Sequence, residues 1–456
     1  MKDPIAKPPL PPRDPPLRLV EENEKPSKRP RDWRAVQWMT VGIGVKRWGV
    51  GAIFGLLLSI AGAILASTYV AVDLSIALMY WVHGVSGALL DPVALGVILL
   101  VAGVLLVAIC LRGTLRSVEG AFMASGSERG GFLETALQQR KLQGGAHIVV
   151  IGGGTGLSTM LRGLRDYSSN ITAVVTMADD GGSSGMLREG GMQPPGDIRN
   201  CIAALAEAEP TVQSLFQHRF EGLGPLAGHS LGNLFFAGMW EMTGSFSQAV
   251  EEVSKALAIR GRVLPSTLED VRLGARLKDG SEIVGQVNVN KSRDIEQVFL
   301  LPESPQASPG AVEAIRDAEI IIIGPGSLYT SIIPNLLVPE IAAAIQKATA
   351  PKLYVCNVMT QPGETTGYKA SDHVRAIIRH IGQGVLTHAA LNSGRVAPEV
   401  LERYRESGAD FVVPDAEAVE LLGVRPLRFN FVNSSDIVRH NPQRLASFIF
   451  RTIGKM

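Results

Sequence analysis

Two neighbouring carboxylates stand at the end of an apolar run, in the segment VVTMADDGGSSG at 174–185. Like charges repel, so a chain that places Asp179 beside Asp180 needs a reason for doing so. At the carboxyl end of a strand, an acidic side chain commonly holds a ribose hydroxyl. The two carboxylates could instead share Mg²⁺, which prefers oxygen ligands, or form a solvated acidic turn. Composition predicts a mobile loop after them, in which Ser183 and Ser184 could close over a ligand.

The segment IVVIGGGTGLS at 148–158 predicts a strand, a glycine turn and a helix. Glycines let the backbone approach a ligand, Thr155 could cap the helix, and free amides at a helix start favour an anion. The spacing is neither a dinucleotide fingerprint, because Leu157 replaces the third glycine, nor a Walker A loop. Phosphate contact and a tight structural turn both stay open for Gly152, Gly153, Gly154, Thr155 and Gly156.

A second helix start follows in PPGDIRNC at 194–201, with Asp197, Arg199 and Asn200 in its first turn. Asp197 is interpreted as an N-cap, or the three side chains together form a phosphate clamp.

The segment GHSLG at 228–232 matches the G-x-S-x-G nucleophile elbow of α/β-hydrolases. That elbow needs a strand before it, and the preceding FEGLGPLA indicates a loop. We therefore interpret the segment as a polar loop that leads into a helix at Gly232, with His229, Ser230 and Asn233 facing a ligand.

Later strand ends repeat the pattern. Gly324, Gly326 and Ser327 follow the run EIIII and could form a second anion-binding turn, while Tyr329 could stack on a base or sugar. Asn357 follows another strand, in VCNVMTQPG. Polar residues at several strand ends would meet at one edge of a parallel sheet, which indicates a polar, phosphorylated ligand that contains a sugar.

The elements that must position these residues are short apolar runs separated by helical patterns. Continuous β-branched runs are typical of strands buried on both faces of a parallel sheet. We predict a doubly wound, Rossmann-like, mostly parallel α/β sheet. Alternating runs around Asp279-Gly280, at 271–289, predict a β-hairpin insertion. Helical stretches are expected between the strands, at 156–167, 198–208, 232–243, 246–258, 334–348, 370–381 and 441–453.

The first part of the chain differs from the rest. Its apolar runs Trp48–Val72 and Val93–Leu111 are each long enough to cross a hydrocarbon core of roughly 30 Å, so we predict two transmembrane helices. The first run starts too late and is too long for a signal peptide. Four parts result: a disordered tail rich in Pro, Lys and Arg, a membrane region, a linker and an α/β domain, at 1–46, 47–112, 113–145 and 146–456.

Lys and Arg flank both spans, whereas residues 73–92 contain neither. The positive-inside rule then predicts a multi-pass membrane protein with both termini and the α/β domain in the cytosol. The net charge of +1 gives no reason to expect nucleic acid as a partner. Cys110, Cys201 and Cys356 form no CxxC pattern, which disfavours a thiolate metal site and a disulfide framework.

Together, IVVIGGGTGLSTMLRGL, ADDGGSSGMLR, PPGDIRNC, LAGHSLGNL, RGRVLPSTLEDV and GPGSLYTSIIPNLLVPEI resemble the YvcK/CofD-like family, most closely its gluconeogenesis-factor (YvcK) branch. The resemblance covers about 147–442, and the membrane spans are a departure from the plain form of the family. The YvcK branch implies a regulator that binds a UDP-sugar such as UDP-N-acetylglucosamine and affects cell shape, envelope precursor supply and central carbon metabolism. The CofD branch implies a 2-phospho-L-lactate transferase that uses a guanosine diphosphate-linked donor, a deazaflavin acceptor and Mg²⁺.

Carried over by position, the resemblance implies that Gly152–Gly156 lie by the diphosphate and that Asp179 and Asp180 face the ribose or Mg²⁺. It implies a cleft lined by Asn200, His229, Asn233 and the Gly324–Ser327 turn, with Tyr404 and Arg439 on the nucleotide.

A non-catalytic, membrane-tethered UDP-sugar-binding regulator is the first interpretation, because no nucleophile–base pair is evident. The transferase comes second, and an NAD-dependent dehydrogenase third. Mg²⁺ is the one cofactor considered, the lipid bilayer is the expected second partner, and a homo-oligomer stays open.

Overall fold

The computed structural model describes residues 45–66, 80, 84, 92–123, 141–208, 210–222, 224–432, 438 and 440–453. The chain separates into two compact units, Met1–Phe132 and Leu133–Met456, and each is described by itself. The predicted disordered tail lies outside the described residues except for its last two positions, and so does much of the predicted linker.

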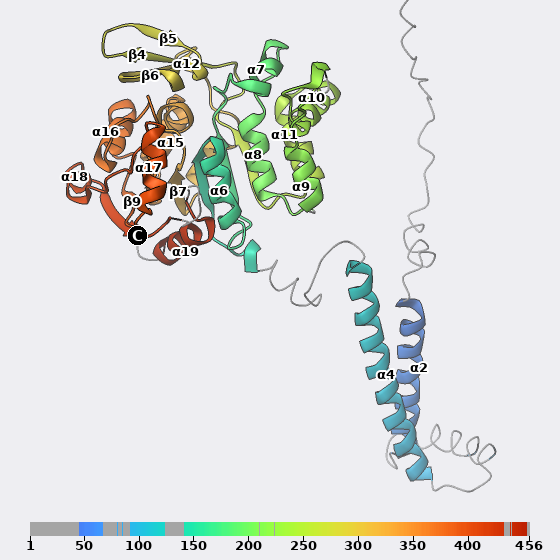
Figure 1. Ribbon diagram of the computed structural model, residues 1–456. Coiled ribbons are helices and arrows are strands. Elements are labelled where there is room, and N and C mark those ends of the chain that lie inside the picture. Colours follow the sequence, from blue (N-terminus) through green and yellow to red (C-terminus); the bar gives the residue numbers. More distant parts are fainter. Residues whose placement is uncertain are drawn as a thin grey trace, which may run out of the picture. The chain divides into compact units, whose positions relative to one another are not determined.

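The first unit contains two helices that pack along each other, α2 (Val45–Ala66) and α4 (Pro92–Met123) (Figure 1). Gly51 of α2 lies opposite Cys110 of α4, and Gly62 lies opposite Leu100, so the pair is antiparallel. A Cβ on Gly62 would come within 2.4 Å of the Leu100 backbone nitrogen. Small residues therefore let the two backbones approach closely.

One stretch among the described residues is long and apolar enough to cross a membrane as a single straight helix, namely Gly96–Thr114 within α4. The apolar stretch of α2, Gly51–Ala63, is shorter. The first predicted span continued to Val72, which lies outside the described residues, so a pair of transmembrane helices is not confirmed. Helix α4 continues to Met123, into the predicted linker, because no Pro interrupts it and most residues there favour helix.

The second unit is built on a seven-stranded sheet in which every neighbouring pair is parallel, with the order β10-β9-β8-β7-β1-β2-β3. The strands are β1 (Ile148–Gly152), β2 (Ile171–Val175), β3 (Arg262–Pro265), β7 (Ile320–Ile323), β8 (Lys352–Val355), β9 (His388–Asn392) and β10 (Arg425–Phe429). From β1 the chain proceeds outward through β2 and β3, and from β7 outward through β8, β9 and β10. The sheet is thus doubly wound, as predicted, and its switch point lies between β1 and β7.

Helices cover the sheet in two groups (Figure 1). In the first group α6 packs on both α8 and α19, and the second group contains the α13–α15, α14–α15, α14–α16 and α16–α18 contacts. Right-handed crossovers that leave the switch point in opposite directions place their helices on opposite faces. The members are α6 (Gly154–Leu164), α8 (Gly196–Leu205), α19 (Pro442–Ile453), α13 (Ala311–Arg316), α14 (Ile333–Leu336), α15 (Pro339–Lys347), α16 (Ala370–Ile381) and α18 (Ala416–Glu420).

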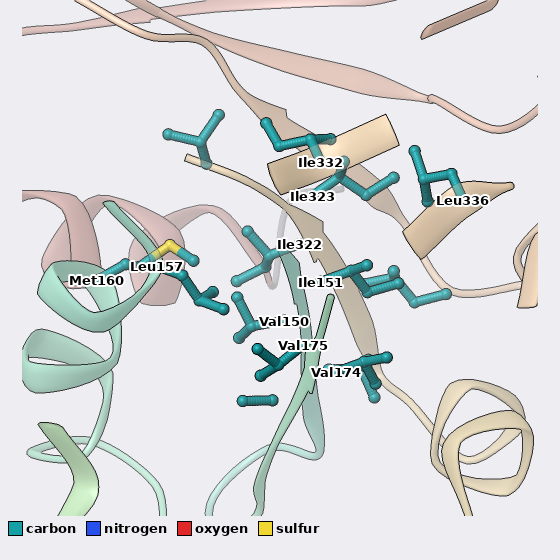
Figure 2. Packing of buried hydrophobic residues seen from close by; sticks show 14 of the residues in the cluster. Val150, Ile151, Leu157, Met160, Val174, Val175, Ile322, Ile323, Ile332 and Leu336 are labelled. Carbon is teal, nitrogen blue, oxygen red and sulfur yellow. The ribbon is translucent and has the colours of Figure 1, made fainter. Parts of the chain in front are cut away.

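Figure 2 shows the centre of the core, where Val150 and Ile151 of β1 meet Val174 of β2 and Ile322 of β7. All residues of β1, β2 and β7 are buried. Apolar side chains on both sides of each strand need cover on both faces, which explains the continuous apolar runs in the sequence.

The predicted hairpin is confirmed and carries a third strand. β4 (Arg272–Leu277) pairs antiparallel with β5 (Glu282–Val284) and with β6 (Ile295–Leu301). A short helix, α12 (Gln286–Lys291), connects β5 to β6.

The helical stretch expected at 334–348 is interrupted, because the segment Leu328–Leu336, which ends in α14, is bent by 77° from α15. Pro339 opens α15, and Val338 before it is extended (φ −73°, ψ 114°). A residue that precedes proline is disfavoured in the helical region, so the chain breaks there.

Candidate functional site

A cleft of about 510 Å³, called the main cleft below, opens at the carboxyl ends of β1, β7 and β8, at the switch point. This is where ligands bind in doubly wound sheets. Among its lining residues are Gly153, Gly154, Thr155, Gly156, Gln286, Gly326, Ser327, Asn357, Tyr404 and His440.

The first glycine turn joins β1 to α6 and lines the main cleft. Helix α6 begins at Gly154, and its N-cap, Gly153, provides no side chain, so the predicted cap by Thr155 is wrong. The N–H groups in the first turn of a helix have no partner within it. None of the hydrogen bonds among the described residues uses the amides of Thr155 or Gly156, which therefore stay free at the cleft wall.

Asp197 reaches this turn from α8. Its carboxylate accepts a hydrogen bond from the Gly154 N–H, so it serves the start of α6, whereas α8 has Pro195 as N-cap and no side-chain cap. A Cβ on Gly153 would lie 2.6 Å from Asp197 Oδ2, which explains the glycine there. Burial, with the neighbouring charge of Asp179, raises the pKa of Asp197 to about 6.

The second glycine turn joins β7 to the helical segment at 328–336, and its polar groups are already paired. The buried Glu364 accepts hydrogen bonds from the Tyr329 N–H (2.7 Å), the Thr330 N–H (3.0 Å) and the Ser327 hydroxyl (2.6 Å). Gly326 donates its N–H to Asn357 Oδ1 at 3.3 Å and accepts from Asn357 Nδ2 at 2.7 Å. These amides are therefore occupied by the chain itself, although Gly326 and Ser327 line the main cleft.

Tyr329 was expected to stack on a ligand, and the structure corrects this. Its side chain is buried, and its hydroxyl lies 2.9 Å from that of Tyr368. Its ring packs edge-on against Tyr368 and His380, and it does not line the main cleft. The apolar ring fills space behind the turn, where burial raises the pKa of its hydroxyl.

The two aspartates that follow β2 have different environments. Asp180 accepts from the backbone N–H groups of Gln286 (2.8 Å) and Val287 (2.9 Å), one with each oxygen, and so caps α12. Asp179 accepts from the Gly181 N–H at 3.1 Å, and burial raises its pKa. Each oxygen of Asp180 thus accepts one backbone N–H and keeps a second lone pair, so Mg²⁺ at this pair stays a prediction.

The expected mobile loop after these aspartates is a helix, α7 (Gly182–Glu189), which is a correction. Side chains from other elements hold it: Ser184 Oγ accepts from the Gly196 N–H at 3.1 Å, and Ser183 Oγ accepts from Asn233 Nδ2 at 2.9 Å. Both serines are buried.

The segment around Ser230 forms no strand–nucleophile–helix elbow. A 3₁₀ turn, Gly224–Leu226, precedes it, and Ser230 is the N-cap of α10 (Leu231–Thr243), where it accepts from the Asn233 N–H. Ser230 is buried and also accepts from Arg199. His229 Nδ1 lies 3.0 Å from Ser183 Oγ. The predicted polar loop into a helix is confirmed.

A second cavity of about 270 Å³, called the β2 cavity below, lies beyond β2 and shares no lining residue with the main cleft. It gathers Asp179, Ser183, Ser184, Asp197, Arg199, Asn200 and Asn233, and also Arg219. The structure thus divides most of the predicted site residues between two cavities, whereas six line neither of them: Gly152, Asp180, His229, Ser230, Gly324 and Tyr329.

Two lining residues of the main cleft come from the end of the chain. The Tyr404 hydroxyl accepts from the Val438 N–H at 3.0 Å. His440 donates from Nε2 to the Cys356 carbonyl at 3.1 Å, and burial lowers the pKa of His440 to about 4. Arg439 lies outside the described residues.

Sequence reasoning missed Arg219, Gln286 and His440, and it did not find the partners of Glu364. Glu364 stands in QPGETTG and Arg219 in QHRFEG, and neither stretch has a pattern that predicts its partner. Gln286 follows the hairpin. Its position near the cleft could be predicted only by knowing that Asp180 caps α12.

Fold and cleft together place the chain in the class of Rossmann-like α/β proteins with a ligand cleft at the switch point. The chain belongs to the CofD family: the family model described as 2-phospho-L-lactate transferase CofD matches residues 148–432. The resemblance seen in the motifs is thereby confirmed.

Among its relatives, a putative gluconeogenesis factor from Nostoc sp. is 44% identical over 446 residues and covers 95% of both chains. The gluconeogenesis factor of Bacillus subtilis is 48% identical over 305 residues, which are 66% of this chain and 96% of that protein. A crystal structure of a Bacillus halodurans protein is similar with a TM-score of 0.66 and 46% identity, and covers 67% of this chain and 99% of its own.

Proposed function

We propose that the protein is a membrane-tethered regulator whose main cleft binds a UDP-sugar such as UDP-N-acetylglucosamine, and that it acts on cell shape, envelope precursor supply and central carbon metabolism. The observation that carries the binding proposal is the open first glycine turn at the switch point, beside Tyr404. Relatives named gluconeogenesis factor support the regulatory part.

The free amides of Thr155 and Gly156 suit a diphosphate, because they add to the positive end of the α6 dipole. Asn357, Ser327 and Gln286 line the cleft and offer hydrogen-bonding groups for sugar hydroxyls. Tyr404 offers a flat ring for the base. A cleft of about 510 Å³ is in the range that holds ligands of this kind, roughly 300–1,000 Å³.

A phospholactyl transferase is the second candidate, favoured by the family model. One observation suits it: the carboxylate of Asp197, with a pKa of about 6, lines the β2 cavity beside the first glycine turn, where it could take a proton from an attacking hydroxyl near neutral pH.

The test is calorimetric titration of the detergent-solubilised full chain with UDP-N-acetylglucosamine, with and without Mg²⁺, followed by chromatography of the mixture. We expect saturable binding and an unchanged ligand. Tyr404→Ala should weaken binding about tenfold through lost stacking, and the matched control Tyr167→Ala, which removes an aromatic side chain outside both cavities, should not.

The protein could instead fail to bind the UDP-sugar, bind a guanosine diphosphate-linked donor and transfer a group to a deazaflavin. That result would contradict the regulator proposal and support the transferase. Equal affinities for the two tyrosine variants would remove the main cleft as the nucleotide site.

The membrane part of the proposal is supported by apolar residues on the outside of the helix pair. Four apolar side chains of these helices are each more than half exposed: Ile53, Leu57, Leu105 and Ile109. The glycines Gly51, Gly62 and Gly103 face the other helix of the pair. Such a surface suits lipid. Fractionation of cells that express the full chain or a fragment from about Gly145 tests the anchor. Equal membrane recovery of both would contradict it.

A further inference from the structure

We propose that His380 is a positioning residue for the main cleft: its neutral ring holds the sheet β5-β4-β6 in place, and protonation of the ring releases this sheet and weakens ligand binding. The sheet is called the small sheet below. The inference rests on the proposed function for the identity of the ligand, whereas the contact between His380 and the small sheet belongs to the chain itself.

The small sheet carries one wall of the main cleft. Helix α12 follows strand β5 directly, and Gln286 and Asn290, one turn apart on α12, line the cleft. A Cβ on Gly363 would lie 2.8 Å from the Ser292 carbonyl oxygen, so the end of α12 fits closely against the segment beyond β8. A shift of the small sheet would therefore move two polar side chains of the cleft.

One edge of the small sheet is held by a side chain. β6 is an edge strand, because it pairs with β4 and with no other strand of the described residues. The Val298 N–H of β6 donates to Nε2 of His380 at 3.0 Å. His380 lies in the last turn of α16, and most residues of this helix that face inward are buried in the core. Helix α16 is therefore a firm support for the small sheet.

The two hydrogen bonds of the ring fix its protonation state. Nδ1 of His380 lies 2.7 Å from the Ala376 carbonyl oxygen, which can only accept, so Nδ1 carries a proton. The Val298 N–H can only donate, so Nε2 is unprotonated. A proton on Nε2 would set two N–H groups against each other. The ring thus anchors β6 only in its neutral form.

The surroundings of His380 favour the neutral ring. Burial lowers its pKa below the ordinary 6.5 and outweighs the opposite effect of its backbone hydrogen bond, and Arg379 lowers the pKa further. The Tyr329 ring packs against it with 5.9 Å between centroids, and burial keeps that hydroxyl protonated by raising its pKa. On β6 the charged residue is Glu296, which lies near Arg276 of β4, and α14 contains no charged residue.

The sign of the pH dependence follows from this lowered pKa. Anchoring favours the neutral ring, so the anchor is complete above about pH 6.5 and is lost as pH falls through the pKa of anchored His380. Ligand affinity of the main cleft should therefore decrease toward acid pH.

The test compares the detergent-solubilised parent with His380→Gln across a pH series from about 7.5 to about 4.5. Glutamine can place an acceptor oxygen near the position of Nε2 and does not titrate in this range. The variant should fold, because His380 is partly exposed and the acceptor is kept. Calorimetric titration with UDP-N-acetylglucosamine should show an affinity loss about fivefold larger in the parent, since one hydrogen bond is lost there. Asp197 and His440 titrate in both proteins, so their effects cancel in the comparison.

Hydrogen exchange gives a readout that does not depend on the ligand. Exchange of residues 286–301, corrected for the intrinsic effect of pH, should become faster toward acid pH in the parent and not in His380→Gln. The matched control is His388→Gln. His388 is a buried histidine of β9 that contacts the Thr387 hydroxyl outside both cavities, so this variant should respond to pH as the parent does.

Each result decides one part of the proposal. Equal pH dependence of exchange in parent and His380→Gln would overturn the anchor, whether or not the ligand binds. A difference in exchange with equal pH dependence of affinity would overturn the effect on the cleft. If the parent binds no UDP-N-acetylglucosamine at any pH, the nucleotide-sugar proposal fails, and exchange alone decides whether His380 holds the small sheet.

Discussion

The turns that follow β1 and β7 look alike in sequence and differ in what occupies their amides. Both contain closely spaced glycines, and they touch, since a Cβ on Gly156 would lie 2.7 Å from the Pro325 carbonyl oxygen. The first turn receives one carboxylate, Asp197, and leaves two amides free at the cleft. The second receives Glu364 and Asn357, which take three amides. A glycine turn is thus an anion site only where the chain supplies too few acceptors of its own.

The strongest way to break this contrast is Glu364→Gln. The glutamine side chain keeps the volume but has one acceptor oxygen fewer. Buried N–H donors at Tyr329 and Thr330 then lose an acceptor. We expect the free energy of unfolding to fall by about 3 kcal/mol, measured by urea denaturation.

Glu282→Gln is the control, because Glu282 is half exposed and pairs with Arg276 at the surface. It should change stability by about 0.5 kcal/mol or less. A loss at Glu364 no larger than this would mean that the second turn does not depend on its internal acceptor.

The first turn can be tested through pH. Folding raises the pKa of Asp197 from 3.8 to about 6, so the folded state holds a proton that the unfolded state has released. Stability from this group is therefore complete below about pH 4, falls as pH rises to about 6, and is then constant, a change of about 3 kcal/mol. Asp197→Asn, which keeps an acceptor for Gly154, should remove that dependence.

Other groups titrate in the same window with the opposite sign. His440, with a pKa lowered to about 4, makes the folded state less stable as pH falls below 6.5. The informative quantity is therefore the difference between parent and Asp197→Asn across the pH series. A constant difference would show that Asp197 does not carry a raised pKa.

The same contrast explains which parts of the molecule the sequence could predict. The runs at 148–151 and 320–323 predicted central strands, because burial on both faces demands continuous apolar residues. Strand β10 was missed, since Arg425-Pro426-Leu427-Arg428 alternates with charge and contains a proline that only an edge strand tolerates. Helix α7 was missed because Gly and Ser are typical of loops, and bonds from distant elements hold it.

The site was predictable to the level of strand ends and no further. Gly152–Gly156 and Asn357 could be placed at one edge of the sheet from local patterns. Which polar groups are already paired could not, because Glu364 and its partners lie 34–37 positions apart. The division of the residues into two cavities depends on such long-range pairs.

The two neighbouring aspartates repeat the contrast at smaller scale. Asp180 accepts hydrogen bonds from two backbone N–H groups at the start of α12, whereas Asp179 lines the β2 cavity. We expect Asp180→Ala to lower the free energy of unfolding by about 1 kcal/mol, as loss of a helix cap does. Asp179→Asn should not destabilise, because it removes a carboxylate whose burial is unfavourable.

Asp166→Ala, at an exposed position after α6, is the control for the removal of an aspartate. Urea denaturation of the three variants ranks them. If Asp180→Ala and Asp166→Ala change the free energy of unfolding equally, then capping by Asp180 does not explain why two aspartates are adjacent.

The smallest expected effect concerns the far wall of the main cleft. Tyr404→Phe keeps the ring that is proposed to contact the base and removes the acceptor for the Val438 N–H. Because water can reach this partly buried amide, the loss should be modest, about a threefold weaker affinity for UDP-N-acetylglucosamine. Tyr167→Phe, whose ring stacks on Phe450 away from both cavities, should bind as the parent does. If Tyr404→Phe lowers the affinity for UDP-N-acetylglucosamine as much as Tyr404→Ala does, the hydroxyl matters more than the ring. It would then act through its hydrogen bond with the Val438 N–H.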